Sequence, residues 1–350
     1  MQEGRANPRQ LYLNKKTLDS FRTQVEEIKE EGMRQNGFAP VVICQLTHSG
    51  RYAKPEGVPA PLIAYNNPLF EKEQPIDKSR IVSDDKLKRL EEAFGATALL
   101  AQEAGFDGAD IKCCHRYLLS EMLSAFTRPG DYGGAFENRT RLLRNAIFAA
   151  KGATSGEFLI TSRVNLYDGF AYPYGFGVSP TGGLMPDLTE PKALVTLLHE
   201  ELRLPMLDFT IGNPYVNPHV NRPYDGGPYV PDEHPLEGVA RMLGCIGQLK
   251  KAFPSLCVIG SGFSYLRQFS PYLAAGAVEQ SVCDLAGFGR MAFAYPDFPR
   301  DTLYGEGFNA RKTCIACGKC SALMRAGTVA GCVVRDGETY LPFYQAHCCV

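Results

Sequence analysis

The sequence predicts an α/β protein built as a TIM-type (β/α)8 barrel, apparently incomplete, with a C-terminal cysteine-rich extension. Short apolar or β-branched runs alternate with amphipathic stretches, which is the pattern of βα units around a parallel sheet. Polar or glycine-rich motifs follow nearly every predicted strand, and in such a barrel the loops after the strands converge on the active site. An open doubly wound sheet binds ligands at one switch point and would not need six such loops.

The predicted elements alternate in order along the chain, beginning with a helix that no strand precedes. Each predicted strand is an apolar or β-branched run, such as PVVICQL at the first and EFLITSRV at the third. The strands are expected at residues 40–46, 107–113, 157–164, 205–211, 256–262 and 282–289. The helices are expected at about residues 16–33, 84–104, 134–151, 189–202, 235–252 and 264–276.

Six strands fall short of a closed barrel, which needs about eight. We therefore expect that the strand at 40–46 and the strand at 282–289 do not close against each other, and that both leave an exposed edge. The alternation stops after residue 301. We accordingly predict a barrel domain over residues 1–301, lacking its first strands, and an extension over residues 302–350.

Composition argues against nucleic acid and membranes as partners. Lys plus Arg (37) nearly balance Asp plus Glu (38), so no large basic field exists to attract polyanions. The longest apolar runs are far shorter than a membrane span. The N-terminal MQEGRANPRQ has neither the apolar region nor the cleavage site of an export signal. We expect a cytoplasmic protein with a small-molecule partner.

Four cysteines in the extension form the sequence's clearest metal-binding motif. Cys314, Cys317 and Cys320 make a CxxCxxC run, and Cys332 follows twelve positions later. Closely spaced thiolates with one remote partner are frequent ligands of a [4Fe-4S] cluster. Zinc usually prefers two separated CxxC pairs, and disulfides are disfavoured in a reducing compartment. We favour the cluster, with zinc and free or oxidised thiols as the alternatives.

Two glycine turns follow the last two predicted strands. Gly260, Ser261 and Gly262 form the first, and Gly289 and Arg290 lie in the second, GFGR. Glycine lets backbone N–H groups approach a phosphate closely, and an arginine adds charge-assisted hydrogen bonds. In barrels, phosphates commonly bind at the loops after strands seven and eight. The alternative is that these glycines only permit tight turns.

Six segments stand in order along the chain: QLTHSGRYAKP, AGFDGADIKCCHRYLLSEMLS, DYGGAFENRTRLL, IGNPYVNPHVNRPYD, VIGSGFSYLRQF and GFGRMAFAYPDFPRD. Taken together, they resemble the old yellow enzyme superfamily of FMN-dependent oxidoreductases. The resemblance extends over about residues 3 to 340 and is greatest to the branch of bacterial 2,4-dienoyl-CoA reductases, whose barrel precedes a cysteine cluster. Relative to that branch, one residue is missing between the second and third cysteines.

The resemblance implies roles for five residues at strand ends. Gln45 would contact the pyrimidine edge of FMN, and Arg163 would stabilise negative charge on the reduced flavin. Tyr117 would deliver a proton and His115 would polarise a substrate carbonyl. Lys112 stands where the family usually has a first histidine, so it would polarise the carbonyl as a flexible point charge. Without the resemblance, Arg163 could as readily be a structural ion-pair partner, and a lone His or Tyr is more often a packed residue than a catalyst.

The implied reaction is reduction of an activated C=C bond, in an enone or enoyl-type α,β-unsaturated carbonyl compound, by hydride transfer from reduced FMN. Electrons would come from NAD(P)H docking directly or from a separate electron-donor protein, because the sequence after residue 340 leaves no room for an FAD domain. A rival hypothesis is a truncated, non-catalytic barrel fragment in which a metal or iron–sulfur site is purely structural. The substrate and the donor are not readable from the sequence.

Overall fold

The computed structural model describes residues 1–227, 229–305 and 308–349. These residues form two compact units, Met1–Ile211 (unit 1) and Gly212–Val350 (unit 2), which are described separately. Among the described residues, no helix combines the length and hydropathy that a membrane span requires.

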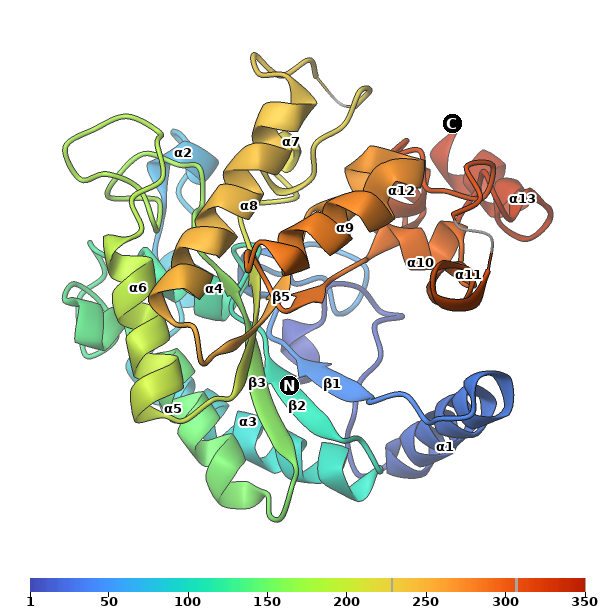
Figure 1. The fold of residues 1–350 in the computed structure, drawn as a ribbon. Coiled ribbons are helices and arrows are strands. Elements are labelled where there is room, and N and C mark those ends of the chain that lie inside the picture. The colour runs from blue at the N-terminus through green and yellow to red at the C-terminus, as the bar shows by residue number, and fades with distance from the viewer. Residues whose placement is uncertain (228, 306–307, 350) are drawn as a thin grey trace. The chain divides into compact units, whose positions relative to one another are not determined.

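Unit 1 is a parallel sheet whose successive strands are joined through helices (Figure 1). Each pair of neighbouring strands is parallel, in the order β1-β2-β3-β4, so β1 lies at one end of this order. The strands are β1 (Ile43–Leu46), β2 (Gly108–Ile111), β3 (Leu159–Asn165) and β4 (Met206–Thr210). The longer helices are α1 (Leu18–Asn36), α3 (Asp84–Glu103), α5 (Phe136–Ala153) and α6 (Thr189–Val195), the last continued by a π-helical turn (Thr196–Glu201). Short helices α2 (Pro68–Glu71) and α4 (Leu118–Leu123) lie in the loops.

The α3 helix shows why the chain folds this way locally. The Ser83 hydroxyl caps its N-terminus by accepting a hydrogen bond from the Lys86 N–H, and two aspartates in the first turn favour the positive end of the helix dipole. A Cβ on Gly95 would lie 2.9 Å from the Ala149 carbonyl oxygen, so glycine allows α3 and α5 to pack closely. Figure 1 shows these two helices side by side below the strands.

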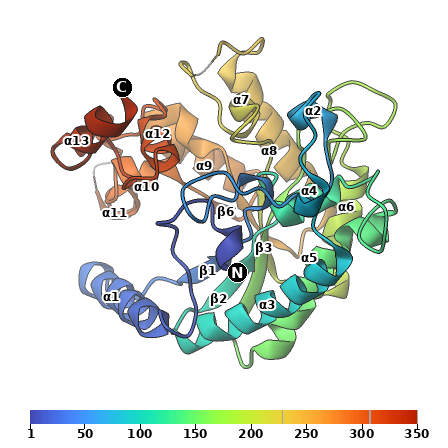
Figure 2. The same ribbon diagram turned by 180° about the vertical axis from the view of Figure 1, so that it is seen from behind.

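Unit 2 contains two parallel strands and a series of shorter helices. Strand β5 (Cys257–Gly260) pairs with β6 (Leu285–Ala286), and Gly260 stands opposite Ala286. The helices are α7 (Pro218–Asn221), α8 (Pro235–Ala252), α9 (Ser270–Glu279), α10 (Arg290–Ala294), α11 (Phe298–Tyr304), α12 (Lys319–Arg325) and α13 (Gly337–Cys348). Helices α12 and α13 lie against each other near the C-terminus (Figure 2).

The predicted α/β class with six parallel strands is confirmed in the described residues. The last strand is much shorter than the predicted 282–289. The helix predicted at 264–276 is instead a 3-10 segment over Phe263–Phe269 followed by α9. Arg267, inside the first segment, has a positive φ of 53°, and this kink interrupts the helical backbone. The expected lack of closure between the first and last strands concerns both units and stays a prediction, as does the division at residues 301 and 302.

Candidate functional site

Each strand of unit 1 contributes one polar residue, and these four residues form two facing pairs. Register places Gln45 opposite Asp110 and Arg163 opposite Asp208. The Gln45 Nε2 donates to Asp110 Oδ1 at 3.0 Å, and Arg163 Nε lies 3.1 Å from Asp208 Oδ2. The structure therefore gives both predicted flavin contacts of this unit, Gln45 and Arg163, a carboxylate partner. Such polar pairs are unusual, because branched apolar side chains more often fill a barrel interior.

The two carboxylates, which the sequence analysis missed, set the electrostatics of this group. Burial, reinforced by the nearby charge of Asp208, raises the pKa of Asp110 to about 6. Burial opposes the charge of Arg163, but the charges of Asp208, Cys114 and Asp110 together outweigh burial and raise the pKa of this guanidinium. Asp110 precedes Lys112 by two positions, and residues two apart in a strand share a face. From this alternation, the sequence could have indicated that Asp110 lies on the same face as Lys112.

Lys112 and Tyr117 lie together after β2. The Lys112 Nζ is 4.0 Å from the centroid of the Tyr117 ring, within the range of a cation–π contact. Burial, with a contribution from the charge of Arg163, lowers the pKa of Lys112. His115 lies between them in the chain and adopts a left-handed φ of 62°, which a non-glycine residue adopts only where its surroundings impose it.

Buried ion pairs fix the loops that carry these residues. Arg116 is fully buried, and its Nη1 lies 2.8 Å from Asp168 Oδ2, which ties the loop after β2 to the loop after β3. Arg51, after β1, pairs with both Glu121 and Glu71. Breaking one partner of a buried pair leaves an uncompensated charge, so these pairs hold the loops in one arrangement.

A cavity of about 310 Å³ runs along β1 and is lined by all residues from Ile43 to Thr47. Gln45 is exposed, and it lines this cavity while it donates to Asp110. The volume is at the lower end of the range for small-molecule pockets, about 300–1,000 Å³. The remaining walls come from the N-terminal segment, α1, α3 and Phe106, including Arg5, Gln10, Leu13, Phe21, Gln24 and Phe94.

In unit 2 the two glycine turns follow neighbouring parallel strands, so they lie at the same end of the β5–β6 pair. Gly262 has φ 104°, and a Cβ there would lie 2.8 Å from Met242 Sδ. A Cβ on Gly260 would lie 3.0 Å from Cys283 Sγ. Close packing against Cys283 and Met242 is thus enough to explain why these two positions are glycine. A Cβ on Gly289 would meet no atom within 4 Å, so the backbone there is open to an approaching group.

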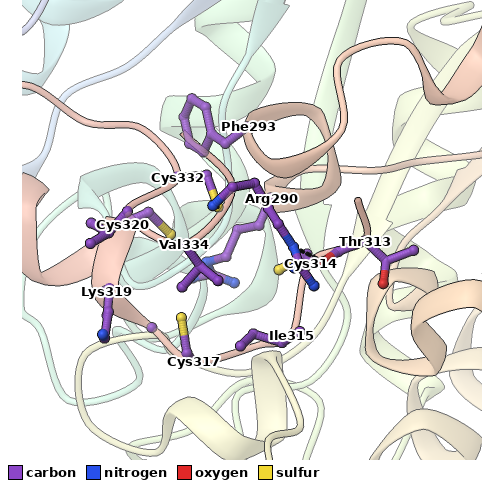
Figure 3. Close-up of a pocket in the computed structure, with 13 residues that line it drawn as sticks. Arg290, Phe293, Thr313, Cys314, Ile315, Cys317, Lys319, Cys320, Cys332 and Val334 are labelled. Carbon is purple, nitrogen blue, oxygen red and sulfur yellow. Dashed lines mark hydrogen bonds between the residues drawn. The ribbon is translucent and has the colours of Figure 1, made fainter. Parts of the chain in front are cut away.

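The four cysteines of the extension line one pocket together with Arg290 (Figure 3). The Ala316 N–H donates to Cys314 Sγ and the Arg335 N–H donates to Cys332 Sγ, both at 3.4 Å. The cavity measures about 20 Å³, roughly the room one water needs. Within the described ranges, no three His, Cys, Asp or Glu side chains are arranged to hold a metal ion. A cluster would therefore require the four thiols to rearrange around it.

Arg290, predicted to bind a phosphate, faces this cysteine pocket. Its Nη2 donates to Ser321 Oγ at 3.3 Å. Burial and the charge of Arg222 lower the pKa of Arg290 to about 10, whereas the thiols of Cys320 and Cys314 act in the opposite direction. Burial also raises the pKa of Cys314. Arg222 is a residue that the sequence analysis did not single out.

Comparison with known proteins gives a family match over the first half of the chain. Residues 2–176 match the profile of the NADH:flavin oxidoreductase / NADH oxidase family. The chain is 33% identical over 158 residues to an NADPH dehydrogenase of Clostridium acetobutylicum, covering 45% of this chain and 42% of that protein. An NADPH dehydrogenase of Bacillus subtilis is 32% identical over 147 residues, covering 41% of this chain and 39% of the relative. The chain thus matches less than half the length of these curated relatives.

Solved structures share the fold over most of the chain. A 2-naphthoyl-CoA reductase in complex with 2-naphthoyl-CoA superposes with a TM-score of 0.73 at 19% identity, covering 95% of this chain and 47% of that one. An old yellow enzyme homologue from Zymomonas mobilis gives a TM-score of 0.63 at 20% identity, covering 88% of this chain and 78% of the other. At these identities the similarity shows a common fold.

Proposed function

Because the chain belongs to the NADH:flavin oxidoreductase / NADH oxidase family, we propose that it is a flavin-dependent NAD(P)H oxidoreductase of the ene-reductase type. Its cofactor would be FMN and its substrate an α,β-unsaturated carbonyl compound with an activated C=C bond. The observation that carries the proposal is the set of polar residues on the four strands of unit 1, which includes both predicted flavin contacts. We further propose a cytoplasmic location, where the thiols stay reduced.

The residues of unit 1 fit the pyrimidine side of a flavin. Gln45 offers an amide that donates and accepts, and its exposed position beside a cavity leaves it accessible. Arg163, held at 3.1 Å by Asp208, is a fixed cation that would favour negative charge on the reduced ring. When bound, FMN would supply the hydride acceptor and donor that no side chain provides.

The glycine turns of unit 2 fit a phosphate. Gly289 leaves open space at its Cα. Arg290 would add a guanidinium by turning from the cysteine pocket, where its Nη2 donates to Ser321 Oγ. Gly260, Ser261 and Gly262 follow the neighbouring strand, so their N–H groups belong to the same end of the strand pair. Phosphate recognition by backbone N–H groups needs such close approach, which a larger side chain would hinder.

Proton transfer and carbonyl polarisation are assigned to the loop after β2. Tyr117 carries a phenolic proton, which it would hold and release to carbon as negative charge develops there. Lys112 lies against its ring, and a buried ammonium or amine can hydrogen-bond a carbonyl oxygen. His115 would add a second donor. The resemblance to 2,4-dienoyl-CoA reductases supports an enoyl-type substrate.

The four cysteines are proposed as ligands of a [4Fe-4S] cluster. The donor set fits chemically, because all four thiols line one pocket and two of them accept backbone N–H hydrogen bonds, which tune such clusters. When bound, the cluster would supply one-electron transfer from a separate electron-donor protein to the flavin. NAD(P)H would instead dock directly on the FMN and transfer a hydride to it. Zinc in the same four thiols is the alternative.

Anaerobic kinetics test the oxidoreductase. Reduction of bound flavin by NADPH or NADH is followed at the visible flavin band, and an enone is then added to the reduced protein. We expect reduction followed by enone-dependent reoxidation without oxygen. If NAD(P)H reduces the bound flavin but no enone reoxidises it, the ene-reductase assignment is wrong. The assignment as a flavin-dependent NAD(P)H oxidoreductase would then still stand.

A second candidate is a protein that binds no flavin and retains the cysteine site as a structural staple. It is favoured by the packing of Gly260 and Gly262, whose lack of a side chain is explained by Cys283 and Met242 without any phosphate. Flavin content separates the two candidates, because only the first retains FMN after purification.

A further inference from the structure

We propose that Arg222 and Arg290 are the counter-cations of an anionic thiolate assembly in the four-cysteine pocket, and that Arg222 raises the reduction potential of the cluster held there. This inference rests on the iron–sulfur site of the proposed function. It goes beyond that function by naming the residues that set the charge balance of the site.

Arg222 is a half-buried cation with buried nitrogen atoms. Its Nε and Nη1 have no hydrogen-bond partner in the described part of the chain. Its Nη2 lies 3.7 Å from the point that a Cβ on Gly318 would occupy, so the guanidinium rests against the loop between Cys317 and Cys320. An unsatisfied buried charge is costly unless an opposite charge compensates it. The position of Arg222 therefore indicates an anionic neighbour.

The nearby groups of opposite sign are the cysteines. Burial lowers the pKa of Arg222, and the groups that act in the opposite direction are Cys320, Cys314 and Tyr224. For Arg290 the opposing groups are Cys320 and Cys314. Neither arginine forms an ion pair with a carboxylate among the residues that the structure describes. Protonated thiols are neutral and would leave both cations uncompensated, whereas thiolates bound to a metal or cluster compensate them.

This arrangement has a consequence for electron transfer. When one electron enters a cluster from an external reductant, the assembly gains one negative charge and no bond to the protein changes. Buried cations stabilise that added charge more strongly than exposed ones, because solvent and salt screen the latter. Charge and hydrogen bonding near the sulfurs are among the factors that set cluster potentials. Arg222 and Arg290 should thus favour the reduced state.

Arg222 is the better residue to vary, because Arg290 is also assigned to the flavin phosphate. Arg222→Gln removes the charge and keeps hydrogen-bonding capacity, and Arg222→Lys keeps the charge. Arg325 supplies a matched control on α12. It is exposed, and its Nη2 contacts the Pro214 carbonyl oxygen at 3.5 Å, so Arg325→Gln removes the same charge from a solvated position.

The experiment is an anaerobic redox titration of the purified full chain, with the reduced cluster followed by electron paramagnetic resonance and iron and sulfide measured on each sample. We expect Arg222→Gln to retain iron and sulfide and to weaken the electron affinity about tenfold, which is about 59 mV for one electron. Arg222→Lys should restore most of the potential, and Arg325→Gln should shift it by less than half as much.

The outcomes separate this inference from the proposed function. A cluster whose potential is the same in Arg222→Gln as in the wild type overturns the inference and leaves the cluster in place. Absence of iron and sulfide from the wild type overturns the cluster. The same variants are then titrated with Zn²⁺, where an anionic tetrathiolate predicts about tenfold weaker binding in Arg222→Gln and unchanged binding overturns the inference.

Discussion

The strand-end group of unit 1 and the cysteine pocket of unit 2 balance charge in different ways. In unit 1, Arg163 faces Asp208 at 3.1 Å and Arg116 faces Asp168 at 2.8 Å, so both guanidinium groups have a carboxylate partner. In unit 2, Arg222 and Arg290 face thiols. The first arrangement is complete within the protein and keeps side chains in place for chemistry. The second is balanced only when the thiols are ionised, which points to a bound metal or cluster.

Replacing the proposed proton donor should have the largest effect on activity. Tyr117→Phe removes the phenolic proton and keeps the ring against Lys112, so we expect turnover with an enone to fall about 10²–10⁴-fold. Flavin reduction by NAD(P)H should be unaffected, and stopped-flow measurement of the two half-reactions shows the split. Tyr272→Phe, at an exposed tyrosine of α9, is the control. Equal slowing of both half-reactions would argue against a proton-transfer role.

Breaking a buried pair of unit 1 should have the largest effect on stability. Arg116→Met leaves Asp168 buried without its cation, and we expect the free energy of unfolding to fall by about 3–5 kcal/mol. Chemical denaturation measures the change. Arg22→Met, which removes an exposed ion pair with Asp19, should cost at most about 1 kcal/mol. Similar losses in the two variants would show that the Arg116–Asp168 pair does not fix the loops.

The raised pKa of Asp110 predicts a pH dependence of stability. Because the folded pKa is about 6 and the usual value is 3.8, the folded state binds more protons than the unfolded state between these values. Stability should therefore fall as pH rises from about 4 to about 6, by roughly 2–3 kcal/mol from this group. Asp110→Asn should abolish that slope in denaturation curves measured across this range. The exposed Asp19→Asn is the control and should keep the fall of stability between about pH 4 and 6. If this fall persists in Asp110→Asn and disappears in Asp19→Asn, the assignment to Asp110 is wrong.

The glycine turns of unit 2 allow a finer test. In Gly262→Ala, the alanine would have to adopt the positive φ of 104°, and its Cβ would press against Met242. We therefore expect the free energy of unfolding to fall by about 1–3 kcal/mol. Gly289→Ala meets no neighbouring atom and should leave the free energy of unfolding nearly unchanged while it weakens FMN binding. Equilibrium FMN titration and thermal denaturation of both variants distinguish packing from phosphate recognition. Unchanged FMN affinity in Gly289→Ala would remove Gly289 from the proposed site.

The fold could be predicted from sequence because the alternation of helix and strand is a local signal. Strand-end residues such as Gln45 and Arg163 could be placed by the same signal. The same alternation puts Asp110 on the face of Lys112. The pairing of Gln45 with Asp110 and of Arg163 with Asp208 could not be predicted, because it depends on strand register. The positive φ of Arg267, which interrupts a predicted helix, could not be predicted, because arginine rarely adopts this conformation.

Cysteine spacing predicted which thiols lie together but not their geometry or the charges around them. It predicted that four thiols belong together, and the structure places all four around one pocket. Spacing does not fix the directions of the sulfur atoms or the charges around them. Arg222 lies 92 residues before Cys314 in the chain, and only the folded structure shows it beside the cysteine loop.

The central claim is that this chain binds FMN through Gln45 and Arg163, and equilibrium binding tests it most directly. FMN released from the purified protein is quantified, and FMN is titrated into the flavin-free wild type and Arg163→Gln. We predict about one FMN per chain in the wild type and about 10- to 100-fold weaker binding in the variant, the expected loss for a charge-assisted hydrogen bond. A wild-type protein that retains no flavin and does not bind it on titration would contradict the account.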